Sequence, residues 1–162
     1  MTTTRRERGF LFEDFEIDRT FDHHWGRTFT AAESMVFATS TMHYNPLYFD
    51  DEYARSVGFT RAPVIPFLVF ATVLGLSVED LSEAGGPFLG LEDLRYGQTV
   101  YPGDTVRASS VVVAARPSAS RPGWGIVEWE TTGTNQREEM VIRYRRTNLS
   151  RRRAQAEEEP RC

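Results

Sequence analysis

The residues from Ala62 to Val78 form the apolar run that most limits how this chain can fold. The run contains Pro63, Pro66 and Thr72 and is short for a membrane span, so we expect a helix buried within protein. Pro66 suits the first turn of that helix, because the first N–H groups of a helix have no intrahelical acceptor. From Pro66 to about Leu76 the helix would be apolar on nearly all sides. Such a helix requires a layer of structure around it, and a wrapped sheet would supply that layer.

The second half of the chain changes from helical to strand-like patterning. Four β-rich segments are separated by Gly, Pro, Asn and Ser, and they span residues 88–100, 105–115, 125–134 and 139–147. Helices followed by a run of strands form an α+β pattern. We therefore predict an α+β protein in which a sheet from the second half of the chain wraps around the apolar helix.

Two shorter helices are predicted before the apolar run. Thr30 and Glu33 form a capping box, and apolar residues then recur at helical spacing up to about His43. Pro46 ends this helix, because the residue before a proline avoids the helical conformation. Asp50 is a suitable N-cap for a second, short helix.

Charge and composition exclude several functional classes. The formal net charge of -4 gives no basic field for nucleic acid. All 19 cationic side chains are arginines, which excludes a Schiff-base lysine and the lysine of a Walker phosphate loop. The single cysteine, Cys162, can form neither an intrachain disulfide nor a thiolate metal site. We expect a cytoplasmic protein that binds neither nucleic acid nor membrane.

A chain of 162 residues is most simply one domain with a substantial core. Residues 1–9 are polar at their start and are predicted to be a flexible N-terminus. Residues 10–148 carry the patterned segments and form the predicted domain. Residues 149–162 are charged and nearly free of apolar side chains, so they are predicted to be a disordered tail.

Two motifs flank the apolar run. Residues 42–50 read Met-His-Tyr-Asn-Pro-Leu-Tyr-Phe-Asp, and residues 100–106 read Val-Tyr-Pro-Gly-Asp-Thr-Val. In order and spacing, the motifs and the apolar run resemble the MaoC-like hydratase/dehydratase family. Its members carry a Gly-Asp-x-Asn-Pro-x-His-x-Asp pattern, an apolar central helix and a Pro-Val-x-x-Gly-Asp-Thr strand. Residues 41–50 and 89–95 are also similar to the mesaconyl-CoA hydratase branch. The resemblance covers about residues 10–148 and implies a single hotdog fold, an antiparallel sheet wrapped around a long helix.

The resemblance also implies a catalytic site. His43 stands where the family has its catalytic Asp, and Tyr48 stands where it has its catalytic His. In the family, one group activates water and the other moves a proton at the α-carbon of a thioester. The backbone N–H of Phe67 matches the family's donor to the thioester oxygen, and the bulk of Phe67 implies a reshaped acyl pocket. Taken without the resemblance, His43 and Tyr48 are more simply a polar contact and a packing aromatic.

Three further residues are candidates for substrate binding. Arg61 and Arg95 could pair bidentately with phosphate or carboxylate groups, and Asn45 matches the family pattern. Asn45 also has a structural interpretation, because its side chain can fix the turn before proline. The adjacent His23 and His24 have no third ligand signalled by the sequence, so we expect no metal site and no cofactor.

Three functions remain open on the sequence. The first is a hydratase or dehydratase of an acyl thioester carried by CoA or a carrier protein, with His43 and Tyr48 as an altered catalytic pair. The second is another hotdog enzyme, such as a thioesterase or an isomerising lyase. The third is a non-catalytic subunit of a heteromeric hydratase. In each case we expect association with a second hotdog chain, most simply as a homodimer, because a single hotdog exposes long edge strands.

Overall fold

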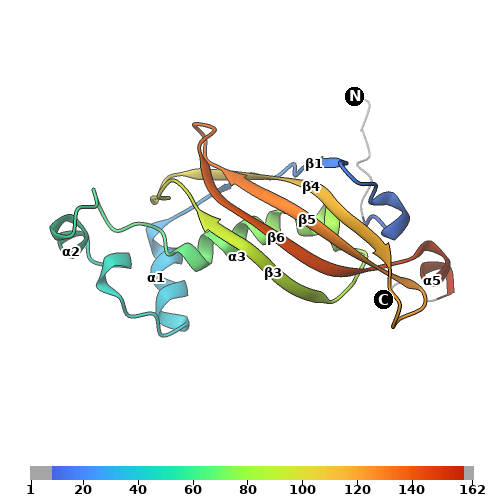
Figure 1. The fold of residues 1–162 in the computed structure, drawn as a ribbon. Coiled ribbons are helices and arrows are strands. Elements are labelled where there is room, and N and C mark those ends of the chain that lie inside the picture. Colours follow the sequence, from blue (N-terminus) through green and yellow to red (C-terminus); the bar gives the residue numbers. More distant parts are fainter. Residues whose placement is uncertain (1–8, 159–162) are drawn as a thin grey trace, which may run out of the picture.

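The computed structural model describes residues 9–158, which form one antiparallel sheet with a helix packed along it and smaller helices at both ends (Figure 1). Residues 1–8, most of the predicted flexible N-terminus, and residues 159–162 lie outside the described part. The strand order is β1-β4-β5-β6-β3, and β2 pairs separately with β4. The strands are β1 (Thr20–Asp22), β2 (Arg27–Thr28), β3 (Phe88–Tyr96), β4 (Thr105–Pro117), β5 (Trp124–Thr134) and β6 (Met140–Arg151).

The helices follow the capping signals of the sequence. The Thr30 hydroxyl accepts a hydrogen bond from the Glu33 N–H at 3.3 Å, so Thr30 is the N-cap that the sequence predicted. The Glu33 carboxylate accepts from the Thr30 hydroxyl at 2.9 Å and not from the Thr30 backbone N–H, so the second half of the predicted capping box is not formed. Asp50 caps the next helix by accepting two backbone hydrogen bonds. The helices are η1 (Phe12–Asp14), α1 (Ala31–Ser40), η2 (Pro46–Tyr48), α2 (Asp51–Ser56), α3 (Pro66–Leu76), α4 (Val78–Leu81) and α5 (Arg153–Glu158).

Helix α3 is the predicted apolar helix, and the sheet covers one side of it. Val69 and Val73 are buried against the sheet. Gly133 of β5 permits this close approach, because a Cβ there would lie 2.9 Å from a methyl group of Val73. The opposite side of α3 exposes an apolar stripe that includes Phe67 and Ala71. The sheet of one chain therefore covers less of the helix than the sequence predicted.

Strand β3 lies at the edge of the sheet and contains a β-bulge. Glu92 pairs with Arg145 and Arg95 with Arg143, so β3 has one more residue than β6 between these pairs. Asp93 lies in this bulge with a φ of 52°, a conformation that Asp adopts more readily than most residues. The additional residue reverses the alternation of side chains along β3.

The turn within residues 100–106, the motif that follows the apolar run, is held by a buried carboxylate. Asp104 accepts hydrogen bonds from the Gln136 side chain at 2.6 Å and from the Tyr101 N–H at 2.8 Å. Burial alone would raise the pKa of Asp104. These two bonds and the nearby Arg137 guanidinium outweigh that effect and hold the pKa below its ordinary value.

The C-terminal segment is more ordered than predicted. The expected tail began at residue 149, but β6 continues to Arg151, and Leu149 and Ser150 are buried. Arg153 follows in α5, and its guanidinium donates to Asp14 at 2.8 Å. The difference arises because polar residues such as Asn148 face the inside of the sheet, which removes the apolar signal of a buried strand.

Polar groups form a chain beneath the C-terminal end of α3. Nδ1 of His23 lies 2.6 Å from Asp80, Nε2 lies 2.9 Å from the Ser110 hydroxyl, and Ser110 in turn contacts Thr131 at 2.8 Å. All four residues are buried. Among the described residues, no cluster of three His, Cys, Asp or Glu side chains could hold a metal ion. We interpret these linked hydrogen bonds as a structural network that satisfies buried polar groups.

Arg146 of β6 is buried beside this network. Its guanidinium lies 5.1 Å from the centre of the Trp129 ring, and its Nε and Nη2 atoms have no hydrogen-bond partner among the described residues. Burial lowers the pKa of Arg146 to about 10 and raises the pKa of the neighbouring Tyr144 to about 12. The Arg146 charge is therefore stabilised mainly by an aromatic face.

The helices of the described part fall short of what a membrane span requires, and none of them has both the length and the apolar character to cross a bilayer.

Candidate active site

The two residues at the family's catalytic positions lie together at the N-terminal end of α3. The His43 ring centre is 5.3 Å from that of Tyr48 and 6.0 Å from that of Phe67. His43 reaches this position because α1 ends just before it. Met42 adopts a φ of 55°, and the His43 N–H donates to the Ala38 carbonyl at 2.8 Å. Three separate segments thus bring an imidazole, a phenol and a helix N-terminus into one place.

The turn between His43 and Tyr48 is fixed by the residues around Pro46. The Asn45 side chain accepts a hydrogen bond from the Leu47 N–H at 3.1 Å and caps η2. Pro46 starts η2, and one turn of this short helix places the Tyr48 ring next to His43. Asn45 itself is exposed, and the observed bond supports its structural interpretation.

The first turn of α3 presents the Phe67 N–H. An N–H group in a first helical turn has no intrahelical acceptor, and no other acceptor for the Phe67 N–H is found in residues 9–158. Ile65, the residue before the helix, is held by its own N–H, which donates to the buried Ser34 hydroxyl at 3.0 Å. That bond joins α1 to the start of α3. The helix dipole also favours negative charge at this end of α3.

A cavity of about 200 Å³ lies beside Tyr48, and neither His43 nor Phe67 is among the residues that line it. Tyr48 and Tyr96 line it together with Pro66, and the Tyr96 hydroxyl donates to the Pro66 carbonyl at 3.1 Å. Burial raises the pKa of Tyr48, and burial together with Tyr48 raises the pKa of Tyr96. Both phenols therefore stay protonated at neutral pH. The other residues lining the cavity are Leu47, Phe59, Pro63, Val64, Val69, Gly97, Gln98, Thr99, Val100 and Val141.

Tyr96 was missed by the sequence analysis, although the sequence holds a signal for it. Leu91 faces α3, and strict alternation from it would make Arg95 face the helix too. Instead the bulge at Asp93 brings Leu94 and Tyr96 to the inner face. The residues that face α3 have an odd number before Asp93, as in Leu91, and even numbers after it, as in Leu94 and Tyr96. Such a change of parity indicates a bulge of one residue.

The two candidate arginines do not join the cluster. Arg95 is exposed on the outer face of the sheet, directly across from Arg143. Arg61 donates to the Pro102 carbonyl at 2.7 Å, and its guanidinium lies 5.6 Å from the centre of the Tyr101 ring. Arg61 thus contacts the turn of the second motif, while Arg95 lies on the far side of β3 from Tyr96.

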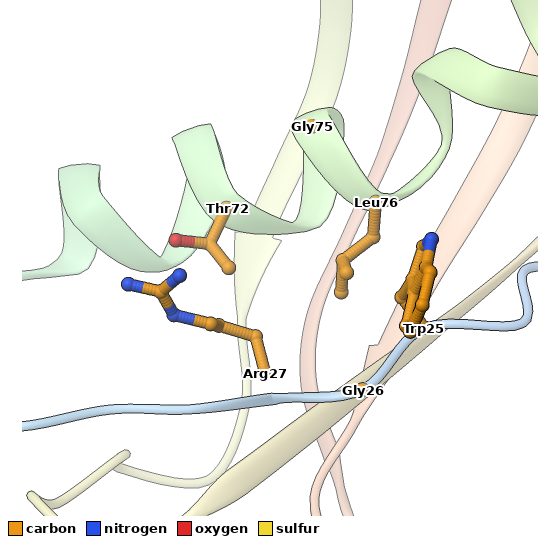
Figure 2. Close-up of a pocket in the computed structure, with 6 residues that line it drawn as sticks. All are labelled: Trp25, Gly26, Arg27, Thr72, Gly75 and Leu76. Carbon is orange, nitrogen blue, oxygen red and sulfur yellow. The ribbon is translucent and has the colours of Figure 1, made fainter.

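A second hollow of about 480 Å³ lies between α3 and the segment before β2 (Figure 2). Trp25 and Arg27 border it on one side, and Thr72, Gly75 and Leu76 of α3 border it on the other. Arg27 already pairs with Glu33 at 3.3 Å, and no acid–base pair lines the hollow. The cluster of His43, with its two proton-transferring groups, is the better candidate for chemistry.

Comparisons with known proteins agree with this architecture. A family model described as mesaconyl-CoA hydratase matches residues 2–160. The mesaconyl-CoA hydratase of Haloarcula marismortui is 40% identical over 152 residues, which are 93% of this chain and 42% of that protein. This chain therefore spans less than half the length of that curated relative.

Two solved structures have the same fold. A MaoC domain protein from Chloroflexus aurantiacus aligns with 100% of this chain and 45% of its own, with a TM-score of 0.87 and 31% identity. A MaoC-like dehydratase from Rhodospirillum rubrum aligns over 90% of this chain and 99% of its own, with a TM-score of 0.80 and 28% identity. The predicted α+β hotdog fold is thus confirmed.

Proposed function

This chain belongs to the mesaconyl-CoA hydratase family, and we propose that it adds water to, or removes water from, an α,β-unsaturated acyl thioester. The observation that carries the proposal is the cluster at the start of α3. It combines His43 and Tyr48, two groups that can transfer protons, with an N–H donor at Phe67, and Tyr48 also lines a cavity. Hydration of a conjugated thioester requires this combination.

In the proposed hydration, His43 is the base that takes a proton from water as its oxygen attacks the β-carbon. Electrons move to the thioester oxygen, which accepts a hydrogen bond from the Phe67 N–H. Tyr48 then gives its proton to the α-carbon, and the proton held by His43 restores the phenol. The raised pKa of Tyr48 keeps the phenol protonated at neutral pH but also makes proton donation more costly, so the assignment rests on the position of Tyr48 next to His43. Dehydration is the same path in reverse.

The cavity supports a short acyl group. Its volume of about 200 Å³ is below the roughly 300–1,000 Å³ of ordinary small-molecule pockets. None of the lining residues carries a formal charge, which favours an uncharged acyl chain within the cavity. We propose that the carrier is CoA or an acyl carrier protein, and that Arg61 and Asn45 contact its polar parts, whereas Arg95, on the outer face of the sheet, would contact the carrier only outside the cluster.

We propose that a second copy of this chain completes the site. In the described part of the chain, no further strand pairs with the outer edge of β3, and its Phe88 and Leu89 are both 49% exposed. The uncovered apolar stripe of α3, which includes Phe67, lies on the side that the sheet does not reach. Joining two copies at β3 would pair the open edge and bury apolar surface. The lone cysteine of the sequence supports a cytoplasmic location for the enzyme.

A non-catalytic subunit is the second candidate. The length comparison favours it, because the curated relative has more than twice the length of this chain and could hold its active residues elsewhere. In that case this chain would bind a second, different hotdog chain. A mixed complex would then be active where the chain alone is not.

Incubating the purified chain with crotonyl-CoA, mesaconyl-CoA and their hydrated forms tests these functions. Mass spectrometry of the products separates them, because a hydratase adds the mass of one water and leaves the thioester intact. A thioesterase would instead release CoA, which a thiol reagent detects. Wild-type protein that converts none of these substrates, while His43→Ala behaves identically, would contradict the proposed enzyme.

A further inference from the structure

Tyr96 contacts the same peptide group whose N–H is proposed to bind the thioester oxygen. Its hydroxyl donates to the Pro66 carbonyl at 3.1 Å, and that carbonyl belongs to the peptide bond between Pro66 and Phe67. We infer that Tyr96 is a positioning residue, whose hydroxyl fixes and polarises this peptide so that the Phe67 N–H becomes a stronger donor. The inference rests on the proposed function and adds a residue to it.

The chemistry of the peptide bond explains how Tyr96 could act at a distance. The C=O and N–H of one peptide share a delocalised electron system, which keeps them planar. A donor at the oxygen draws electrons toward it and leaves the N–H more positive. Hydrogen bonds linked in this way strengthen one another by about 10–30% each. The Phe67 N–H, without an acceptor among residues 9–158, is available to use that polarisation.

The Pro66 carbonyl can accept two hydrogen bonds. Because Pro66 is the first residue of α3, the helical pattern gives its carbonyl one donor, the Phe70 N–H. Pro66 has no N–H of its own, and the preceding Ile65 N–H is held by Ser34. Tyr96 thus adds a side-chain donor to a carbonyl that the helix already holds, and this second bond increases the polarisation of the peptide.

The structure uses a strained feature of β3 to bring Tyr96 to this position. The bulge between Glu92 and Arg95, with Asp93 at a φ of 52°, turns Tyr96 toward α3. A residue other than glycine in that conformation is strained. Gly97, the next residue, allows the edge to stay close to β6, because a Cβ there would collide with the Met140 carbonyl. Such irregularities concentrate at functional sites.

The substitution Tyr96→Phe tests the inference with little risk to folding. It removes the hydroxyl and keeps the ring that lines the cavity. Tyr53→Phe is the matched control, because Tyr53 is 42% exposed, close to the 43% of Tyr96, and its hydroxyl has no hydrogen bond among the described residues. Both variants should keep the melting temperature of the wild type.

A first experiment reads the peptide directly and requires no activity. Labelling proline with ¹³C at the carbonyl and phenylalanine with ¹⁵N gives signals only from Pro–Phe pairs, and the sequence has two, Pro66–Phe67 and Pro87–Phe88. In Tyr96→Phe the Pro66 carbonyl and Phe67 amide proton resonances should both move upfield. The Pro87–Phe88 signal should not move, and Tyr53→Phe should move neither signal.

A second experiment measures the consequence for the thioester. Butyryl-CoA labelled with ¹³C at its carbonyl is saturated and cannot be hydrated, so its infrared C=O stretch reports the hydrogen bond alone. The stretch of the bound ligand should rise in Tyr96→Phe toward its value in water-free solvent. Removing an oxyanion donor entirely lowers kcat by about 10²–10³-fold. Tyr96→Phe should remove about 10–30% of that effect on a logarithmic scale. For the unsaturated substrate, kcat should therefore fall roughly two- to eight-fold, with KM unchanged.

The outcomes separate the inference from the proposed function. Unchanged Phe67 resonances, or an unchanged carbonyl stretch in Tyr96→Phe, would overturn the role of Tyr96 even if the wild type is an active hydratase. A KM increase without any change in kcat would also overturn it, because that pattern indicates uniform binding. If the wild type converts no substrate but both spectroscopic shifts occur, the hydratase proposal fails. The role of Tyr96 at a thioester-binding N–H would then stand.

Discussion

The substitution Ser34→Ala should destabilise the protein by about 1–3 kcal/mol, the cost of leaving a buried donor unsatisfied. The Ser34 hydroxyl is the acceptor for the Ile65 N–H at 3.0 Å. Ser34 is 2% exposed and Ile65 is fully buried, so water cannot replace the lost acceptor without opening the contact between α1 and α3. For a chain of this length, the free-energy loss corresponds to a melting temperature lower by about 2–12 °C.

Thermal and urea unfolding, at one fixed protein concentration, would measure this change. Ser118→Ala is the matched control, because the Ser118 hydroxyl also accepts a backbone N–H, from Arg121, but in an exposed turn. Its effect should stay within about 0.5 kcal/mol. Because Ser34 anchors the residue before the Pro66–Phe67 peptide, kcat should fall as well. Equal stability losses in the two variants would refute the reasoning that burial makes the Ser34 bond important.

Four further results are expected. His43→Ala should lower kcat by roughly 10²–10⁴-fold, and Tyr48→Phe should lower kcat while leaving the melting temperature unchanged, as enzyme assays and calorimetry would measure. Asp104→Asn should cost most stability at neutral pH. Because the folded pKa of Asp104 is lowered, its contribution is present above about pH 4 and is lost as pH falls through the folded value, so the two unfolding curves should converge in acid. Arg146→Met should leave the free energy of unfolding unchanged or raise it by up to about 3 kcal/mol, because a buried charge is removed and a side chain that packs on Trp129 remains. A large loss of stability would reveal an anionic partner of Arg146. Light scattering should give about twice the 18.5 kDa chain mass, and an active monomer would contradict the two-chain site.

The sequence predicted the elements whose causes are local. Local patterns along the chain predicted the N-cap at Thr30, the proline start of α3 and the four β-rich segments, because these features depend on neighbouring residues. The prediction that His43 and Tyr48 share a site came from the resemblance to the MaoC-like family, and the structure places their ring centres 5.3 Å apart.

The features that the sequence did not predict depend on contacts between distant residues. His23 looked like a loop histidine, but Asp80 and Ser110, far away in the chain, make its burial possible. Asn148 and Ser150 look like part of a polar tail, because polar side chains here occupy the buried positions that apolar side chains usually occupy in a strand. The uncovered stripe of α3 was hidden for a related reason, since composition shows that a helix needs covering but not which chain covers it.

The bulge in β3 makes the cavity wall sensitive to a change of a single codon. Replacing Asp93 with valine would disfavour the positive φ that the bulge requires, because a β-branched residue rarely adopts it. Without the bulge, β3 would alternate regularly from Leu91, so that Arg95 would face the cavity and Tyr96 would face solvent. That exchange of a neutral phenol for a guanidinium suits an acyl group that ends in a carboxylate. Deleting Asp93 would instead leave Leu94 and Tyr96 on the inner face, because it removes the residue that β3 has in excess of β6. When related chains are aligned, the residue type at position 93 therefore carries information about the cavity wall that the flanking residue identities do not.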